Sequence, residues 1–393
     1  MKRLPLWLVC ILATTLVPYS AWKVVEFVAW AAGTVRYVDS TAGACTGNYS
    51  IASRNCTGSD GNSYATINAA VAAMAAGDIT YVRTGTYTDS NINLPTGVSA
   101  LVPSVLQAYQ NDLVTIRPLS GTRVIYNTGR AFQKYWNLDL DGVNQTSDGV
   151  KIDAGSHGLV LGGDMTAGGA YRCKIRNATN MGFSLQGISD NVTVSGCDIF
   201  DNGLTIPSPY AHGLYIQKGV GFILEKSRVR RNGCNGIQLY GASTPQVTFA
   251  TIRRNQFYDN ARVSGCGTQV YLANDDHIFE YNHVWNDIEV GNTYGVRVEL
   301  ITPARTIIRH NSLYNAGTNG ISIVTGAVDI VVQNNLVIGS TNAIVNNGTN
   351  TTLTDNLTSG TASSIFTSIV SGSIDLSLKA GSTPIDGGTA IGG

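Results

Sequence analysis

Asparagine recurs at one position of a repeat that runs through most of this 393-residue chain. In register, the residues at this position are Cys173, Cys197, Ser227, Asn255, Asn282, Asn311, Asn335 and Asn356. Their successive spacings are 24, 30, 28, 27, 29, 24 and 21 residues. An amide repeated once per turn can hydrogen-bond to the amide of the next turn and so satisfy buried polar groups along a stack. The spacing therefore predicts a solenoid with roughly 27 residues in each coil.

Each repeat also contains a segment in which apolar and polar residues alternate, which is typical of a half-buried strand. These segments are Gly182–Gln186, Gly213–Gln217, Gly236–Tyr240, Gln269–Ala273, Gly295–Glu299 and Gly320–Val324. A second short strand and a third apolar pair follow, as in Thr306–Ile308 and Leu313–Tyr314. The column from Phe183 to Ile321 is expected to point inward, with coils about 4.8 Å apart. The fold class predicted is all-β, a single-stranded parallel β-helix.

Caps are expected at both ends, because a solenoid otherwise exposes its first and last sheet edges. One β-helix domain is predicted over residues 32–393, with an N-terminal cap over about 32–100. A short capping helix is predicted from Tyr64 to Ala76, after an N-cap at Ser63 and before Gly77. Residues 359–393 lack the repeated asparagine and are expected to form an irregular C-terminal cap.

The N-terminus is typical of an export signal. Lys2 and Arg3 precede an apolar run that begins at Leu4. Residues 1–31 are predicted to be a signal peptide that is cleaved after Ala31 or near Ala21, and an uncleaved membrane anchor is the alternative. We expect the mature protein to be secreted, periplasmic or extracellular, and free of the membrane once the signal is removed.

Six of the seven cysteines follow the predicted signal, and an even number in an exported chain permits disulfides. The repeat register predicts the pairs Cys173–Cys197 and Cys234–Cys266. Cys45 and Cys56 are expected to pair and close a small loop near the mature N-terminus. Buried free thiols are the alternative for Cys173 and Cys197, because thiols also pack well in a stacked column.

Segments near both ends resemble those of exported β-helix proteins. These segments are Tyr37–Asp39, Ser63–Ala70, Tyr81–Tyr87 and Gly381–Gly387. The chain resembles the pectate-lyase-like superfamily, which includes polysaccharide lyases, and the resemblance implies a right-handed parallel β-helix. The Asn-Thr-Asp motif of polygalacturonase-type hydrolases and the Asp-Pro-His motif of mannuronan epimerases are absent. Charged residues make up 13% of the chain and the net charge is zero, which argues against a nucleic-acid partner.

Outward positions of the first strand in each coil are the predicted binding face. The residues expected to bind substrate there are Tyr215, Gln217, Gln238, Tyr240, Tyr271 and Glu299. Aromatic rings beside amides and cations suit an acidic polysaccharide. A glycoside hydrolase generally needs two facing carboxylates, and only Glu299 has its position on this face set by the repeat. A uronate lyase needs a base and a positive group or Ca²⁺ against the substrate carboxylate, so the residue types favour a lyase.

The candidate catalytic residues are Lys218 or His212 as the base and Arg262 and Arg297 as carboxylate ligands. Lys218 and Arg297 lie three coils apart, roughly 14 Å at sheet spacing, so Arg262 is the better partner for Lys218. Each residue also has a structural interpretation. Lys218 could be an exposed turn lysine, His212 could satisfy a turn, and Arg297 could form a surface ion pair with Glu299.

Calcium is a further expectation, although no calcium motif is present. Asp198, Asp201 and Asp259 are the candidate ligands. A basic run from Arg228 to Arg254 is interpreted as a solvated surface or a polyanion site. Besides the lyase, two other functions stay open, namely a non-catalytic glycan-binding or structural β-helix of a cell surface or virion, and a glycoside hydrolase. The sequence leaves the oligomeric state open.

Overall fold

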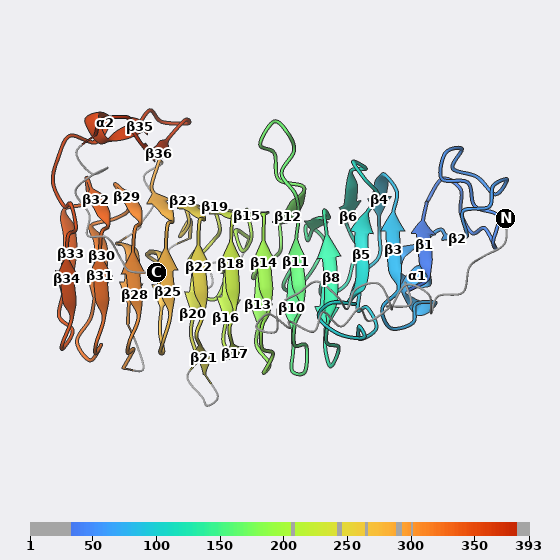
Figure 1. Ribbon diagram of the computed structural model, residues 1–393, viewed down its shortest axis with the longest axis horizontal. Helices are drawn as coiled ribbons and strands as arrows, with labels where there is room; N and C mark the ends of the chain where they lie inside the picture. Colours follow the sequence, from blue (N-terminus) through green and yellow to red (C-terminus); the bar gives the residue numbers. More distant parts are fainter. Residues whose placement is uncertain are drawn as a thin grey trace, which may run out of the picture. The chain divides into compact units, whose positions relative to one another are not determined.

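A computed structural model describes residues 33–205, 209–241, 246–263, 266–287, 293–299 and 302–382. Over these residues the chain winds repeatedly through three parallel sheets (Figure 1). Each full coil passes through the nine-stranded sheet, then the thirteen-stranded sheet, then the ten-stranded sheet. The predicted parallel β-helix is therefore confirmed. No helix within the described residues is long and apolar enough to span a membrane.

The nine-stranded sheet contains the first strand of each predicted repeat. In spatial order its strands are β7 (Ile125–Asn127), β10 (Val150–Ile152), β13 (Phe183–Leu185), β16 (Leu214–Ile216), β20 (Ile237–Leu239), β24 (Thr268–Leu272), β27 (Tyr294–Val298), β30 (Asn319–Ile323) and β33 (Asn342–Asn346). The predicted inward column is confirmed, because Phe183 and Ile321 at its ends and the residues between them in register are fully buried.

The thirteen-stranded sheet comes second in each coil. Its strands in order are β2 (Asn62–Tyr64), β1 (Val35–Val38), β3 (Ile79–Val82), β5 (Ser104–Ala108), β8 (Gln133–Trp136), β11 (Val160–Gly162), β14 (Thr193–Ser195), β18 (Ile223–Glu225), β22 (Thr251–Arg253), β25 (Ile278–Glu280), β28 (Ile307–Arg309), β31 (Val331–Gln333) and β34 (Thr352–Thr354).

The ten-stranded sheet comes third. Its strands in order are β4 (Gly85–Tyr87), β6 (Val114–Ile116), β9 (Asp139–Asp141), β12 (Cys173–Arg176), β15 (Cys197–Phe200), β19 (Arg228–Arg230), β23 (Gln256–Tyr258), β26 (His283–Trp285), β29 (Ser312–Tyr314) and β32 (Leu336–Ile338). Two small sheets complete the described sheets. One is formed by β17 (Gly219–Val220) with β21 (Val247–Thr248), and the other by β35 (Phe366–Ser368) with β36 (Asp375–Leu378).

The predicted asparagine ladder is present at the corner between the thirteen- and ten-stranded sheets. The side-chain amide of Asn282 donates to Asn311 Oδ1 at 3.1 Å, and that of Asn311 donates to Asn335 Oδ1 at 2.9 Å. Each amide also donates to a backbone carbonyl of the preceding coil, as Asn282 does to Ile252 at 2.9 Å. The ladder therefore satisfies polar groups that the stacked corner removes from water.

A second amide ladder, which the sequence analysis missed, lies between the ten- and nine-stranded sheets. Asn202 donates to Asn232, Asn232 to Asn260 and Asn260 to Gln269, with N···O distances of 2.9, 2.9 and 2.6 Å. Gln269 then donates to Asn286 at 2.6 Å. The recurrence of asparagine shortly after the third strand of each coil is the sequence feature that could have predicted this ladder.

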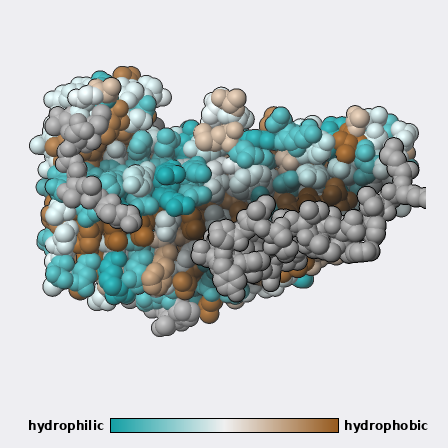
Figure 2. Space-filling model, in the orientation of Figure 1, coloured by the Kyte–Doolittle hydropathy of each residue, from teal (hydrophilic) through white to brown (hydrophobic). Residues whose placement is uncertain are grey.

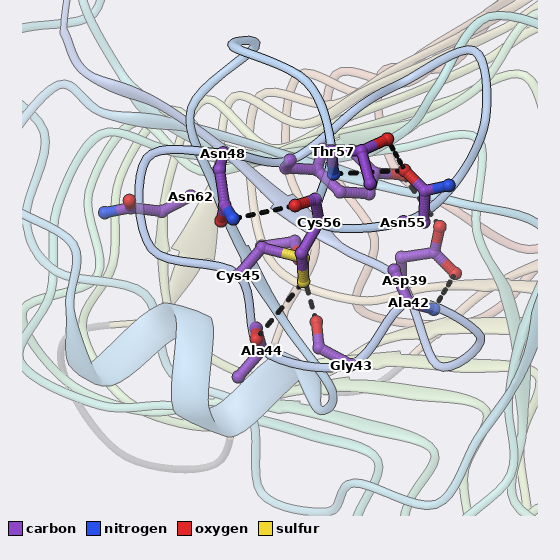
Figure 3. Close-up of a disulfide and its surroundings, with 12 residues drawn as sticks. Asp39, Ala42, Gly43, Ala44, Cys45, Asn48, Asn55, Cys56, Thr57 and Asn62 are labelled. Carbon is purple, nitrogen blue, oxygen red and sulfur yellow. Dashed lines mark hydrogen bonds between the residues drawn. A yellow bond between two sulfur atoms is a disulfide. The ribbon is translucent and has the colours of Figure 1, made fainter.

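All three predicted disulfides are present. The Cα atoms of Cys173 and Cys197 are 4.6 Å apart in paired strands, so the free-thiol alternative for this pair is wrong. Cys234 and Cys266 link turns of consecutive coils. Cys45 and Cys56 close a loop of the N-terminal cap, where the Asn48 amide donates to the Cys56 carbonyl oxygen at 2.7 Å (Figure 3).

The capping helix is shorter than predicted. Helix α1 (Ile67–Ala72) begins after Thr66, whose side chain accepts a hydrogen bond from the Ala69 amide at 3.2 Å. The predicted N-cap at Ser63 is wrong, because Ser63 lies in β2 and pairs with β1. Ile67 and Ala70 are buried, as the predicted apolar face requires.

The C-terminal segment is more ordered than the predicted irregular cap. Helix α2 (Ala362–Ile365), β35 and β36 pack on the outer face of the ten-stranded sheet rather than over the last coil (Figure 1). Ile365, Phe366 and Leu376 form a buried cluster there with residues of β26 and β32. Residues 383–393 of the predicted cap and the predicted signal peptide lie outside the described residues.

Candidate functional site

The predicted binding residues lie together on the outer face of the nine-stranded sheet. Tyr215, Gln238, Tyr271 and Arg297 occupy consecutive paired positions of β16, β20, β24 and β27. The second column consists of residues that directly follow these strands, namely Gln217, Tyr240, Ala273 and Glu299. Adjacent coils of a sheet are about 4.8 Å apart, so the two columns run side by side along the solenoid axis. They are polar and aromatic except at Ala273, which is fully buried.

Two of the predicted sugar-stacking rings are largely covered. Tyr215 and Tyr271 expose 8% and 7% of their surface. Burial raises the pKa of Tyr215 to about 12 and also raises the pKa of Tyr271. The Tyr271 hydroxyl lies 3.5 Å from Glu299 Oε2. Both phenols are therefore protonated hydrogen-bond donors, and the less buried Tyr240 offers more ring surface to a ligand.

His212 is buried beneath this face, at 1% exposure. Its ring stacks on Tyr215 with centroids 5.5 Å apart, and neither ring nitrogen has a hydrogen-bond partner in the described part of the chain. Burial lowers the pKa of His212 to about 3. The imidazole is therefore neutral near pH 7 but shielded from substrate, and its side chain forms no hydrogen bond with the described residues of the turn.

Arg297 forms an ion pair with Glu299, two residues further along the same coil. Its guanidinium group also lies 4.2 Å from the Tyr294 ring centroid. The structure thus matches the surface ion pair that the sequence analysis left open for Arg297. A substrate carboxylate would have to compete with Glu299 for this cation.

Lys218 and Arg262 lie beyond opposite ends of the strands. Lys218 follows β16, whereas the Arg262 amide donates to the carbonyl oxygen of Asn232, in the turn before β20. At least five residues of extended chain separate the two levels, roughly 17 Å at about 3.3 Å per residue. The structure therefore does not bring together the predicted pair of Lys218 and Arg262.

Lys218 itself is partly exposed and has no ion-pair partner among the residues that the structure describes. Ile216, two residues before Lys218, pairs with Leu185 on one side and Leu239 on the other. In register, Lys218 therefore lies between Gly187 and Gly241. A Cβ atom at Gly241 would lie 2.4 Å from the Gln217 carbonyl oxygen, so this close approach of two coils requires glycine. Gly187 and Gly241, the residues in register with Lys218, therefore place no side chain beside it.

The three aspartates predicted to bind calcium do not fit a shared ion. Asp198 accepts four hydrogen bonds from Arg228 and Arg230, and Asp201 pairs with Arg231. Burial raises the pKa of Asp198, but these guanidinium groups outweigh it and hold the pKa below its usual range. Asp259 accepts from the Asp287 amide at 2.8 Å. Nowhere in the described ranges do three or more His, Cys, Asp or Glu residues cluster as metal ligands.

Comparison with known proteins bears on the fold. A family model described as a right-handed β-helix region matches residues 137–298. The solved structure of pectate lyase Pel9A superposes with a TM-score of 0.61, at 16% identity, over 92% of this chain and 93% of that protein. The chain is a right-handed parallel β-helix with the pectate-lyase-like fold. An alginate lyase from Paenibacillus sp. str. FPU-7 shares this β-helix fold, with a TM-score of 0.57 and 11% identity over 72% of this chain and 95% of the lyase.

One curated relative is similar in sequence to this β-helix protein. Pectate lyase PEL9 of Emericella nidulans is 31% identical over 196 residues, which is 46% of this chain and 45% of the lyase. The β-helix protein thus spans slightly less than half the length of that relative.

Proposed function

We propose that this protein is an exported polysaccharide lyase that cleaves an acidic, uronate-containing glycan by β-elimination on the outer face of the nine-stranded sheet. The observation that carries the proposal is Lys218, a partly exposed amine without an ion-pair partner in the described residues, beside a polar and aromatic column. The sequence similarity to a pectate lyase supports the same substrate class. The three disulfides fit an oxidising compartment, as export would require.

In this reaction the Lys218 amine acts as the base that removes the proton from C5 of the uronate. The electron pair of that C–H bond forms a double bond between C4 and C5. The bond from C4 to the glycosidic oxygen breaks, and the leaving oxygen takes up a proton. Gln217 and Tyr240 lie in the adjacent column and would hydrogen-bond to sugar hydroxyls.

Arg297 would hold a different sugar of the same polysaccharide chain. It lies three coils from Lys218, about 14 Å along the axis, so it cannot contact the uronate that reacts. Because Glu299 already neutralises Arg297, its contribution to carboxylate binding is expected to be smaller than that of a free cation. Arg262 lies at the far end of the strands. It would contact only a polysaccharide that runs across the sheet rather than along the solenoid axis.

The test follows the ultraviolet absorbance of the unsaturated uronate that β-elimination creates. The purified protein is incubated with pectate, alginate, chondroitin or hyaluronan, with and without Ca²⁺. We expect turnover of one polymer, and a loss of at least about a hundredfold in Lys218→Ala. Lys226→Ala is the matched control, because Lys226 is an exposed lysine in a turn after the thirteen-stranded sheet. Equal rates in the two variants would exclude Lys218 as the base.

A second candidate is a glycan-binding β-helix without catalytic activity. Two predicted catalytic residues favour this candidate, because His212 is buried away from substrate and Arg297 is already ion-paired with Glu299. Absence of turnover on every polymer, together with retained binding, would support this function instead of the lyase.

A further inference from the structure

A second surface, on the outer face of the ten-stranded sheet, alternates guanidinium and aromatic groups. One column of outward positions runs through β12, β15, β19, β23 and β26 and contains Arg176, Phe200, Arg230, Tyr258 and Trp285. The neighbouring column contains Lys174, Asp198, Arg228 and Gln256. We call the residues of the two columns from β12 to β23 the Arg–aromatic face.

Positive charge is in excess on this face. Arg228 and Arg230 both donate to the carboxylate of Asp198, at 2.6 to 3.0 Å. Two cations thus share one anion, and each guanidinium bonds through Nε and Nη2, leaving Nη1 free of described protein partners. Lys174 is paired in register with Asp198 but forms no ion pair among the described residues. Arg176 of this face pairs with Asp139 and Asp141 of β9, so the four cations of the face and these three carboxylates leave a formal charge of about +1 here.

Flat apolar groups lie beside these cations. The Arg230 guanidinium lies 4.3 Å from the Phe200 ring centroid, and Arg228 lies 5.1 Å from that of Tyr171. Tyr258 stacks on Trp285 with centroids 4.4 Å apart and an interplanar angle of 9°. Phe200, Tyr171 and Tyr258 are only partly buried, so part of each ring can contact a ligand. Aromatic faces combined with charged donors suit a planar-faced, anionic ligand such as an acidic sugar.

Two projections bound the face along the solenoid axis. The hairpin from 163 to 172, held by a Met165–Tyr171 bridge, rises between β11 and β12 on one side. The segment of α2, β35 and β36 covers β26, β29 and β32 on the other side, and its cluster also packs against Tyr258 at the edge of the face (Figure 1). Figure 2 shows the lower, largely hydrophilic surface between the two projections. The Cys173–Cys197 disulfide pins β12 to β15 directly beneath the face.

We propose that the Arg–aromatic face is a second glycan-binding site, which takes a short stretch of an anionic polysaccharide along the axis. From β12 to β23 the face spans three coil steps, about 14 Å. Carboxylates of the glycan would bind the free edges of Arg228 and Arg230 and the amine of Lys174. Sugar rings would lie against Phe200 and Tyr258. The site does not depend on catalysis at Lys218, because it lies on another sheet.

The test measures retardation of the purified protein in native gels that contain pectate, alginate or hyaluronan, with neutral dextran as the reference. Lys174→Gln removes a charge without breaking any described ion pair, and Arg228→Gln leaves Asp198 paired to Arg230. We expect each variant to weaken binding of an anionic polymer about three- to tenfold. Arg253→Gln is the matched control, because Arg253 pairs with Glu225 on the thirteen-stranded sheet.

Asp198→Asn gives the opposite sign. It removes the shared anion, so it should strengthen binding of an anionic polymer, and more so at low salt. Thermal unfolding of each variant verifies that the fold is intact. The site is ruled out if Lys174→Gln and Arg228→Gln bind as wild type does, if Arg253→Gln weakens binding equally, or if no anionic polymer is retarded. Lys218→Ala separates the two surfaces, since it should abolish turnover and leave retardation by the Arg–aromatic face in place.

Discussion

Asn282 makes four hydrogen bonds from a fully buried side chain. It accepts from the backbone and side-chain amides of Asn255, and it donates to the Ile252 carbonyl oxygen and to Asn311 Oδ1. An amide in this position therefore links three consecutive coils. Loss of the side chain leaves donors and acceptors of its neighbours buried without partners, and each unsatisfied group costs about 1–3 kcal/mol.

Asn282→Ala should therefore lower the free energy of unfolding by roughly 3 kcal/mol. Denaturant-induced unfolding followed by circular dichroism measures the change. Asn144→Ala is the control, because Asn144 is an exposed amide with one hydrogen bond to the Pro118 carbonyl oxygen. A destabilisation of equal size in both variants would show that the ladder contributes nothing beyond an ordinary surface amide.

His212 makes stability depend on pH. Its pKa is about 3 in the folded protein because of burial, against about 6.5 in an unfolded chain. Between these values the unfolded chain binds a proton that the folded chain does not. The free energy of unfolding should therefore fall as the pH is lowered from about 6.5 toward 3, by up to about 1.4 kcal/mol per pH unit from this residue.

His212→Phe keeps a ring against Tyr215 but cannot be protonated, so the variant should lose less stability between pH 6 and pH 4 than wild type. Unfolding midpoints across this range measure the difference in slope. His310→Phe should change the slope less, because the His310 ring is only partly buried. An unchanged slope in His212→Phe would mean that His212 is accessible to protons in the folded state.

Among the elements, the C-terminal segment of α2, β35 and β36 covers one end of the ten-stranded sheet. Phe366 at the start of β35 is fully buried against this sheet, in a cluster with Trp285 and Ile338. A large aromatic side chain at such a position typically contributes 3–5 kcal/mol to stability.

Phe366→Ala should release α2, β35 and β36 from the sheet and expose Trp285, which is 5% exposed in the intact protein. We expect a red shift of tryptophan fluorescence and a lower unfolding temperature. Phe249→Ala serves as the comparison, because the Phe249 side chain is 58% exposed and should be nearly neutral. Unchanged fluorescence in Phe366→Ala would mean that the segment stays docked through other contacts.

At the scale of the whole β-helix, each coil contacts only its neighbours, so stability is a sum over coils and interfaces. Among the described residues, the last strands β33 and β34 have a paired strand on one side only. The residues of β34 are all exposed, whereas those of β20 and β24 are mostly buried. Local unfolding should therefore cost less free energy at the C-terminal coil than at the coils of β20 and β24.

Hydrogen exchange should be at least about tenfold faster for amides of β33 and β34 than for those of β20 and β24. Mass spectrometry of peptides from the two regions measures the ratio. Equal protection at both places would mean that another chain covers the last coil in solution. Raising the protein concentration would then increase protection of β33 and β34 alone.

Periodic features could be predicted from the sequence because they repeat in every coil. The inward column, the first asparagine ladder and the pairs Cys173–Cys197 and Cys234–Cys266 follow from one alignment of the repeat. Features without a repeat were predicted less well. The helix start was placed at Ser63, which lies in β2 and pairs with β1 instead. A sequence pattern that occurs in only one coil covers few residues. Strand pairing with the adjacent coils therefore decides the local structure there.

The sequence by itself determined the solenoid, its period and which residues face inward, because apolar alternation and stacked amides are local patterns that recur. Only the tertiary structure decided which polar side chains are free to act. Arg228 and Arg230 meet Asp198 across about 30 residues of chain, and His212 is covered by its surroundings. Charge neutralisation and burial depend on which side chains meet across adjacent coils and turns. The repeat pattern specifies where each coil lies, but not how these side chains pair.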